Sequence, residues 1–168
     1  MSELGVQVLA RSTNELARLE EAAVRHRNRL AEEGYRRRVA ASPQDAEALT
    51  RLGMLLWSAG RSREAMSLLD RALRARPAFA EAHYNKGVFL RFNGQPAEAR
   101  AAFEAALRLD PRFPAAHQQL GFALATQGEA EAAERNFERA LELDPADTVA
   151  RDGLNELREI LKARPPSK

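Results

Sequence analysis

Two histidines are the first residues whose type and spacing could do chemistry. His83 and His117 lie 34 residues apart, but no carboxylate or third histidine stands with them at the spacing of a metal site. Zinc needs at least three protein ligands. Neither histidine has a serine partner placed for nucleophilic catalysis, and the chain has no cysteine. We therefore predict a protein with no catalytic residues, no metal and no cofactor, and interpret both histidines as core residues with polar tips.

A stripe of apolar and aromatic side chains is the second candidate, here for the chemistry of binding. Met54 and Trp57 are three residues apart. Tyr84, Val88 and Phe92 follow at spacings of four, so each set lies on one face of a helix. Exposed apolar faces usually mark binding sites, and tryptophan is a frequent interface anchor. The candidate partner-binding residues are Thr50, Met54, Trp57, Tyr84, Asn85, Val88, Arg91, Phe92, Gln118 and Phe122. The alternative is that these side chains pack against the next helix.

The elements that position this stripe come from a pattern that occurs three times at a spacing of 34 residues. Two glycine columns, two alanine columns and a proline column recur, together with a column of large apolar residues. The columns are Gly53, Gly87 and Gly121; Gly60, Gly94 and Gly128; Ala65, Ala99 and Ala133; Ala72, Ala106 and Ala140; Pro77, Pro111 and Pro145; and Leu69, Phe103 and Phe137. A fixed period of this length predicts a repeat architecture.

Each repeat is predicted to form two helices. In the first repeat, Asp45 caps a helix that runs to about Ser58, and Gly60 ends it in the left-handed region. Ser62 is expected to cap the second helix, which stops before Pro77. The glycine inside each first helix costs about 1 kcal/mol relative to alanine. Its threefold recurrence predicts that a neighbouring helix crosses too closely for a side chain.

These residues resemble the tetratricopeptide repeat, whose unit is 34 residues long with a W-x2-L-G-x2-Y pattern. The pair Leu52-Gly53 and the pair Leu120-Gly121 match the L-G step, and Lys86-Gly87 keeps its glycine. The resemblance implies an all-α, right-handed α-solenoid. Its three helix-turn-helix repeats would cover 46–79, 80–113 and 114–147, preceded by an N-terminal helical segment at 1–45 and followed by a capping helix and tail at 148–168.

The resemblance also implies a function, because in this family the second stripe lines a concave groove that takes a peptide or helix. We therefore predict a non-catalytic protein–protein interaction module, an adaptor or assembly factor that binds an apolar or amphipathic segment. Some relatives hold a C-terminal carboxylate with Lys, Asn and Arg on this face. Here only Asn85 agrees, which disfavours that mode. Arg61 and Glu131 are expected to lie outside the groove.

The N-terminal segment has three possible roles. Ser12 and Glu15 fit a capping box, so residues 13–40 are expected to be helical and 1–12 loosely docked. The helix is either one long element or a degenerate repeat, since Ala31, Tyr35 and Val39 keep the phase of a second helix. It is predicted to be a cap, a lid over the apolar groove, or a self-association element that makes the protein a homo-oligomeric scaffold.

Charge and hydropathy indicate whether the protein binds nucleic acid, is secreted or spans a membrane. Charged residues make up 30% of the chain, and the formal net charge is only +2. The arginine-rich stretch from Arg25 to Arg38 is diluted by glutamates, so nucleic-acid binding is the lesser alternative. No secretory signal or membrane span is recognised, and a cytoplasmic protein is predicted. At the C-terminal end, Arg158 replaces a core leucine, as suits a terminal helix, and 164–168 form a polar tail.

Overall fold

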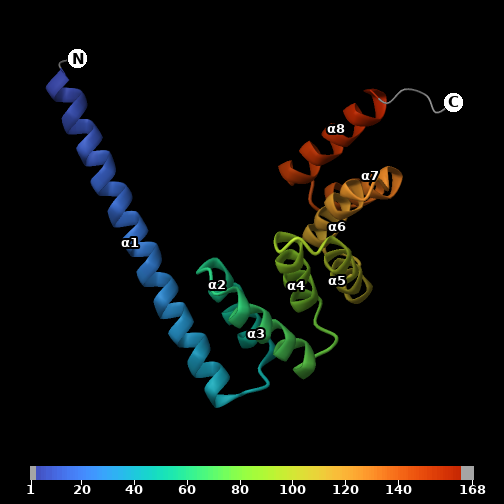
Figure 1. Cartoon of the computed structure of the whole chain (residues 1–168), viewed down its shortest axis with the longest axis horizontal. Helices are drawn as coiled ribbons and strands as arrows, with labels where there is room; N and C mark the ends of the chain where they lie inside the picture. The colour runs from blue at the N-terminus through green and yellow to red at the C-terminus, as the bar shows by residue number, and fades with distance from the viewer. Residues whose placement is uncertain (1–2, 164–168) are drawn as a thin grey trace.

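The computed structural model describes the backbone of residues 3–163 and the side chains of residues 15–163, so the tail predicted at 164–168 lies outside the described residues. Every regular element in this range is a helix. The helices are α1 (Glu3–Ala41), α2 (Ala46–Ser58), α3 (Ser62–Ala75), α4 (Ala80–Phe92), α5 (Pro96–Leu109), α6 (Pro114–Thr126), α7 (Ala130–Leu143) and α8 (Thr148–Ala163). Helices α2 to α7 pack as three successive pairs, with α1 and α8 at the two ends (Figure 1). The predicted all-α solenoid is confirmed.

Glycine makes the turn inside each pair. Gly60, Gly94 and Gly128 have φ of 78°, 73° and 80°, a conformation that costs a side-chain-bearing residue energy. The turn after α2 is closed by a hydrogen bond of 2.8 Å from the Arg61 N–H to the Leu56 carbonyl, which satisfies a carbonyl at the helix end. The prediction for Gly60 is confirmed.

The caps at the helix starts agree with the sequence in one place and differ in another. Asp45 caps α2, because its carboxylate accepts a hydrogen bond of 2.9 Å from the Ala48 N–H. The prediction that Ser62 caps α3 is wrong. Ser62 is already the first helical residue, and the cap position belongs to Arg61, which makes no side-chain cap bond. The tight glycine turn leaves only Arg61 between Gly60 and the next helix.

The glycines inside the first helices lie at close helix crossings, as predicted. A Cβ on Gly53 would lie 3.2 Å from the Ala65 carbonyl oxygen in α3. A Cβ on Gly121 would meet the ring of Phe137 in α7 at 2.8 Å, and that ring is 1% exposed. Hydrogen in place of a side chain therefore lets each pair close on a large buried residue of the second helix.

The first helices of the pairs form the inner layer of the solenoid. Helix α2 contacts α4, α4 contacts α6, and α6 contacts α8. Within residues 3–163, the second helices α3, α5 and α7 make no contacts with one another. Helices on the inside of a curved stack are closer together than those on the outside, so α2, α4, α6 and α8 line the concave face.

The N-terminal segment is one continuous helix, which decides between the two predicted forms. It begins at Glu3, so a start at Ser12 and loose residues before it are wrong for the described part of the segment. No proline interrupts residues 3–12, and the helix runs through them. Only its C-terminal part is docked: Ala31, Tyr35 and Val39 are half-buried, in the phase of a second helix against α2.

The rest of α1 projects away from the solenoid (Figure 1). All side chains from Glu15 to Leu30 are exposed. Among the described residues, the backbone of α1 comes close only to that of α2, and the Arg36–Glu64 ion pair adds a side-chain contact with α3, so α1 does not cover the concave face. The prediction of a lid formed within the chain is therefore wrong for this structure.

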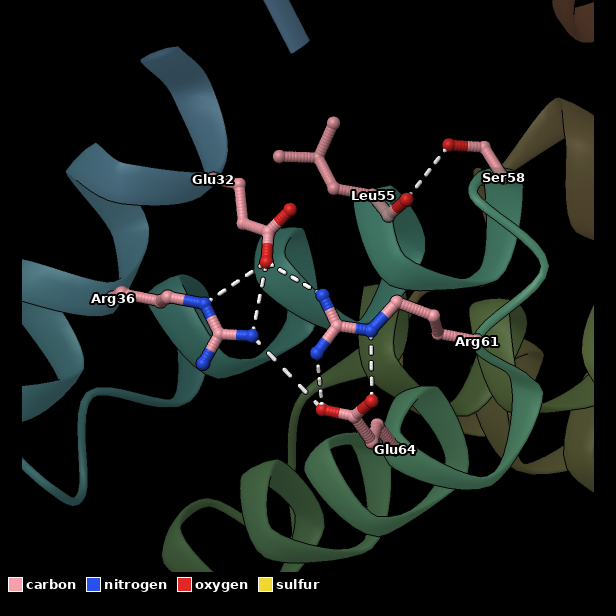
Figure 2. A network of polar contacts seen from close by, with 6 residues as sticks. All are labelled: Glu32, Arg36, Leu55, Ser58, Arg61 and Glu64. Atoms are coloured by element: carbon pink, nitrogen blue, oxygen red, sulfur yellow. Dashed lines mark hydrogen bonds and ion pairs between the residues drawn. The ribbon is translucent and has the colours of Figure 1, made fainter. Parts of the chain in front are cut away.

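A group of ion pairs fixes α1 to the first repeat (Figure 2). The Glu32 carboxylate accepts hydrogen bonds of 2.9 Å from Arg36 Nε and 2.8 Å from Arg61 Nη1. Arg61 also donates two bonds, of 2.7 and 2.6 Å, to Glu64. The guanidinium of Arg61 therefore lies between carboxylates of α1 and α3. Arg61 therefore has a structural role at the junction of α1 with the first repeat.

Candidate functional site: the concave face

The aromatic residues of the inner face reach from each first helix to the next. The Trp57 ring on α2 lies 5.3 Å from the Phe92 ring and 6.3 Å from the Phe89 ring, both on α4, measured between centroids. Phe89 is buried, whereas Phe92 is 63% exposed. The Trp57–Phe92 pair therefore has one side against the core and one side open to solvent.

Tyr84 and Phe122 repeat this arrangement further along. The Tyr84 ring on α4 lies 4.8 Å from that of Phe113, the residue before α6. The Phe122 ring on α6 lies 4.9 Å from the Phe137 ring, and a Cβ on Gly153 of α8 would lie 2.9 Å from it. Packing against the next helix, the alternative weighed for this stripe, is thus part of what these two rings do.

The predicted binding residues divide by burial. Thr50 is fully buried, and its hydroxyl donates a hydrogen bond of 2.7 Å to the Ala46 carbonyl of its own helix. Asn85 and Val88 are also buried, so these three offer a partner almost no surface and are removed from the candidate site. Those that remain accessible are the half-buried Met54, Trp57, Tyr84, Arg91, Gln118 and Phe122, and the exposed Phe92.

A polar group lies beside these rings. The Gln118 amide donates hydrogen bonds of 2.8 Å to both carboxylate oxygens of Asp147, and Asp147 caps α8 by accepting from the Ala150 N–H at 2.9 Å. Burial raises the pKa of the Tyr84 hydroxyl; the positive charge of Arg91 opposes that rise and the negative charge of Asp147 adds to it. Gln118 and Asp147 are thus a hydrogen-bonded pair, and the charges of Asp147 and Arg91 both act on the Tyr84 hydroxyl. Asp147 was not predicted, because its spacing in sequence marks it as a repeat-junction residue.

Arg91 supplies a positive charge at the site. Its guanidinium carbon lies 4.5 Å from the centre of the Phe92 ring, within the range of a cation–π contact. Its Nε is buried and has no hydrogen-bond partner among the described residues. That nitrogen is shielded from solvent, so what Arg91 presents to a ligand is the positive charge of a half-buried guanidinium.

An apolar pocket of about 360 Å³ extends the face between α6 and α8. Phe122, Leu157 and Ile160 are among its lining residues, and Ile160 is 60% exposed. The sequence predicted only a capping role for α8, because the pocket depends on how α8 stacks on α6 and α7. The predicted capping character also appears: Arg158 donates hydrogen bonds of 2.7 Å to Glu134 and Glu138 of α7.

The two histidines bind backbone at the repeat junctions. His83 Nε2 lies 2.9 Å from the Pro77 carbonyl oxygen, and His117 Nε2 lies 3.1 Å from that of Pro111. A carbonyl oxygen only accepts, so each ring donates an N–H to it. The side chains hold the start of α4 and of α6 to the loop before it, in keeping with a structural role.

Comparison with known families gives the class of the protein. A model described as tetratricopeptide repeat matches residues 16–77 and 50–111, and a second model with the same description matches residues 92–157. Together these matches span most of the chain, which therefore belongs to the tetratricopeptide repeat family. No curated protein sequence matches it.

Solved structures with a similar fold include peptide-binding and other members of the family. The first tetratricopeptide domain of Spaghetti (RPAP3), bound to the HSP90 peptide SRMEEVD, is 23% identical with a TM-score of 0.68, covering 71% of this chain and 95% of that one. A double mutant of MamA from RS-1 is 23% identical with a TM-score of 0.71, covering 86% and 81%. The Sgt2 domain from Aspergillus fumigatus is 21% identical with a TM-score of 0.66, covering 74% and 87%. At these identities the likeness concerns the fold.

The helices were also compared with the requirements of a membrane span. None of those in the described part of the chain combines the length and the apolar character that crossing a bilayer needs.

Proposed function

We propose that the concave face of α2, α4 and α6 binds an amphipathic segment of another protein, and that the chain acts as a non-catalytic adaptor or assembly factor. The observation that carries this proposal is Phe92, which is 63% exposed and packs against Trp57 in a tilted arrangement, with 5.3 Å between the ring centroids. A large aromatic ring held in place by a second ring loses little conformational entropy on binding, which is why such residues act as interface anchors.

The chemistry of the face indicates the character of the segment. Met54, Trp57 and Phe92 offer apolar contact, and Arg91 beside them offers a positive charge. A segment with an apolar side chain flanked by a carboxylate would satisfy both. This combination supports an amphipathic ligand that is acidic at one edge of its apolar side.

The mode of binding proposed here differs from the capture of a chain end. Of the positions that hold a terminal carboxylate in some relatives, Thr50 and Asn85 are buried here, and Met54 is apolar. The site therefore has no set of basic and amide groups aimed at one carboxylate. We propose that it takes an internal segment, whose backbone has no terminal charge to be neutralised.

Nucleic acid is less well supported as a ligand. In the arginine-rich part of α1, Arg25 pairs with Glu21 at 3.3 Å, Arg36 with Glu32 and Arg38 with Asp45. Binding to a phosphate backbone depends on cations free to displace counterions. The pairing lowers that capacity.

Selection from a random-peptide display library, followed by affinity measurement of the selected peptides, tests the proposal. We expect peptides that combine apolar and acidic residues, and a loss of about tenfold or more in affinity for Phe92→Ala, the size expected of an anchor residue. Arg91→Gln should weaken the acidic peptides selectively. Glu131→Ala, an exposed change on α7, is the control and should leave affinity unchanged. Selected peptides that bind Phe92→Ala as tightly as wild type would contradict the proposal.

A further inference from the structure

The free part of α1 carries an apolar stripe that the solenoid does not cover. Leu16, Leu19 and Leu30 are 60%, 67% and 53% exposed, and Ala23 between them is also exposed. The spacings of three, four and seven residues place all four on one side of the helix, in the pattern of a coiled-coil seam. Removing leucine side chains from water is favourable, so this stripe favours a partner.

The stripe faces away from the body of its own chain. Helix α1 docks on α2 through Tyr35 and Val39. Val39 lies nine residues after Leu30, and at 3.6 residues per turn these two side chains point in roughly opposite directions. The ion pairs of Glu32 with Arg61 hold α1 in this orientation. The stripe therefore cannot turn onto its own solenoid while α1 stays helical and docked, and its partner must come from another molecule.

The charged side chains that flank the stripe indicate which partner helix is complementary to it. Glu15 and Glu20 border its N-terminal half, and Arg27 and Arg29 border its C-terminal half; all four are exposed. In helical phase, Glu20 and Arg27 lie along one border, and Glu15 and Arg29 along the other. A second α1 aligned in parallel would set glutamate against glutamate and arginine against arginine. An antiparallel second copy sets each glutamate opposite an arginine.

We propose that two copies of this chain associate through α1, paired antiparallel about the region of Ala23. With Ala23 at the centre, Leu16 of each copy lies opposite Leu30 of the other, and the small side chain at Ala23 lets the helix axes approach. Glu15 and Glu20 of each helix face Arg29 and Arg27 of the second. Complementary charges on the borders of a seam set its orientation, because like charges in the parallel form repel.

This association goes beyond the proposed binding of a segment in the concave face and does not depend on it. It would leave both concave faces open, because the stripe lies on the side of α1 opposite to Val39, which docks on the first repeat. A dimer of this form would present two binding faces in one particle, which raises avidity for a partner that carries two copies of the segment.

Light scattering on the full chain over a range of concentrations tests the proposal. Wild type should pass from monomer to dimer as concentration rises, and Leu16→Glu with Leu19→Glu should stay monomeric. The matched control is Ala17→Glu with Val24→Glu, which adds the same charge to exposed apolar positions off the stripe and should still dimerise. Circular dichroism checks that both variants remain helical. A wild type that stays monomeric throughout, or stripe variants that dimerise like wild type, would overturn the proposal.

Charge reversal tests the orientation. Glu15→Arg with Glu20→Arg should lose self-association, because arginine would then face arginine, and Arg27→Glu with Arg29→Glu should lose it for the corresponding reason. An equimolar mixture of the two variants should regain a dimer. In a parallel pair, neither variant would add like-charge contacts, so undiminished self-association of both variants would overturn the antiparallel form. A dimer that is abolished by Phe92→Ala would instead place α1 in the concave face of the second copy and overturn the pairing of two α1 helices.

Discussion

A Cβ atom on Gly87 would lie 2.6 Å from Cε1 of Phe103, whose ring is fully buried. The closest approach of α4 and α5 is thus made by the smallest residue of one helix and a large aromatic residue of the other. The ring is also bordered by Tyr84 of the concave face, 6.0 Å away between centroids. The crossing that holds the repeat together therefore also sets the floor of the candidate site.

The first prediction compares two glycine-to-alanine changes inside helices. Gly87→Ala should destabilise the protein by about 1–3 kcal/mol, since the added methyl overpacks a ring with no free space. Gly34→Ala should stabilise it by up to about 1 kcal/mol, because alanine is the better helix former and a Cβ there has nothing within 4 Å. Urea unfolding of both variants measures the difference. Equal stabilities would show that the Phe103 ring can move aside at no cost.

The partner of Gly87 can be tested in the same way. Leu69 takes the place of Phe103 in the first repeat, and there a Cβ on Gly53 would lie 3.5 Å from the leucine side chain, an ordinary contact. The cost of Gly87→Ala should therefore shrink when it is measured in a Phe103→Leu background. This coupling is what a double-mutant cycle between touching residues reports.

The second prediction concerns acid stability. The Ala48 N–H lowers the pKa of the Asp45 carboxyl below its ordinary value of 3.8 by donating a hydrogen bond, and the Arg38 guanidinium adds to the effect. A carboxyl group whose pKa is lower in the folded protein than in the unfolded chain stabilises the fold at any pH above its pKa in the unfolded chain. This stabilisation is lost as the pH falls through the pKa of the group in the folded protein. The contribution of Asp45 should thus be complete at neutral pH and be lost below about pH 4, near the unfolded carboxyl pKa.

Comparison of Asp45→Ala with wild type at two pH values checks this. At pH 7 the variant should lose about 1 kcal/mol, the usual value of a helix cap, and the difference should narrow under acid conditions. Asp152→Ala, at an exposed position inside α8, is the control and should show a much smaller loss at pH 7. A difference that stays constant from neutral to acid pH would rule out a role for the charge of Asp45.

Much of the fold could be predicted from the sequence because single residues carry the information. The left-handed turns require glycine, which is found at Gly60, Gly94 and Gly128, and the close helix crossing requires glycine at Gly87. The glycine columns therefore specify both the turns and the crossings. The start of α1 was missed because a serine three residues before a glutamate looks the same in the middle of a helix as at its end. Ser62 was misassigned because a serine in the first turn looks the same in sequence as a serine at the cap. After the glycine turn the helix begins at Ser62 itself, one residue earlier than predicted.

The candidate site was predicted less well, because it depends on how neighbouring helices stack. Periodicity placed Thr50 and Asn85 on the same stripe as Trp57, yet both are buried between α2, α4 and their neighbours. Local spacing cannot show how deep a side chain lies once a second helix is beside it. The roles of Asp147 and Arg61 were missed in the same way, since their partners lie 29 residues away in sequence.

The third prediction separates anchors from core residues on the concave face. Phe122 packs against Phe137 and Gly153, so Phe122→Ala should cost about 3 kcal/mol, at the lower end for a buried phenylalanine. Phe92→Ala should change stability by less than about 1 kcal/mol, because most of the ring is already in water. Thermal unfolding measures both. Similar losses for the two variants would mean that Phe92 is part of the core and not an anchor for a ligand.

The last prediction concerns the attachment of α1 to the solenoid. Few apolar side chains hold the docked part, and the Glu32–Arg61 pair, at 2.8 Å, joins it to the turn between α2 and α3. Arg61→Gln should therefore speed amide hydrogen exchange in residues 31–41 by roughly two- to fivefold, the effect expected from a partly exposed ion pair. Added salt should reduce the difference from wild type, because it screens the pair in the native protein. Arg139→Gln, which breaks the Arg139–Glu142 pair within α7, should leave exchange in α1 unchanged. If Arg61→Gln also left it unchanged, the apolar contacts of Tyr35 and Val39 and the ion pairs of Arg36 and Arg38 would set the direction of α1 without the Glu32–Arg61 pair.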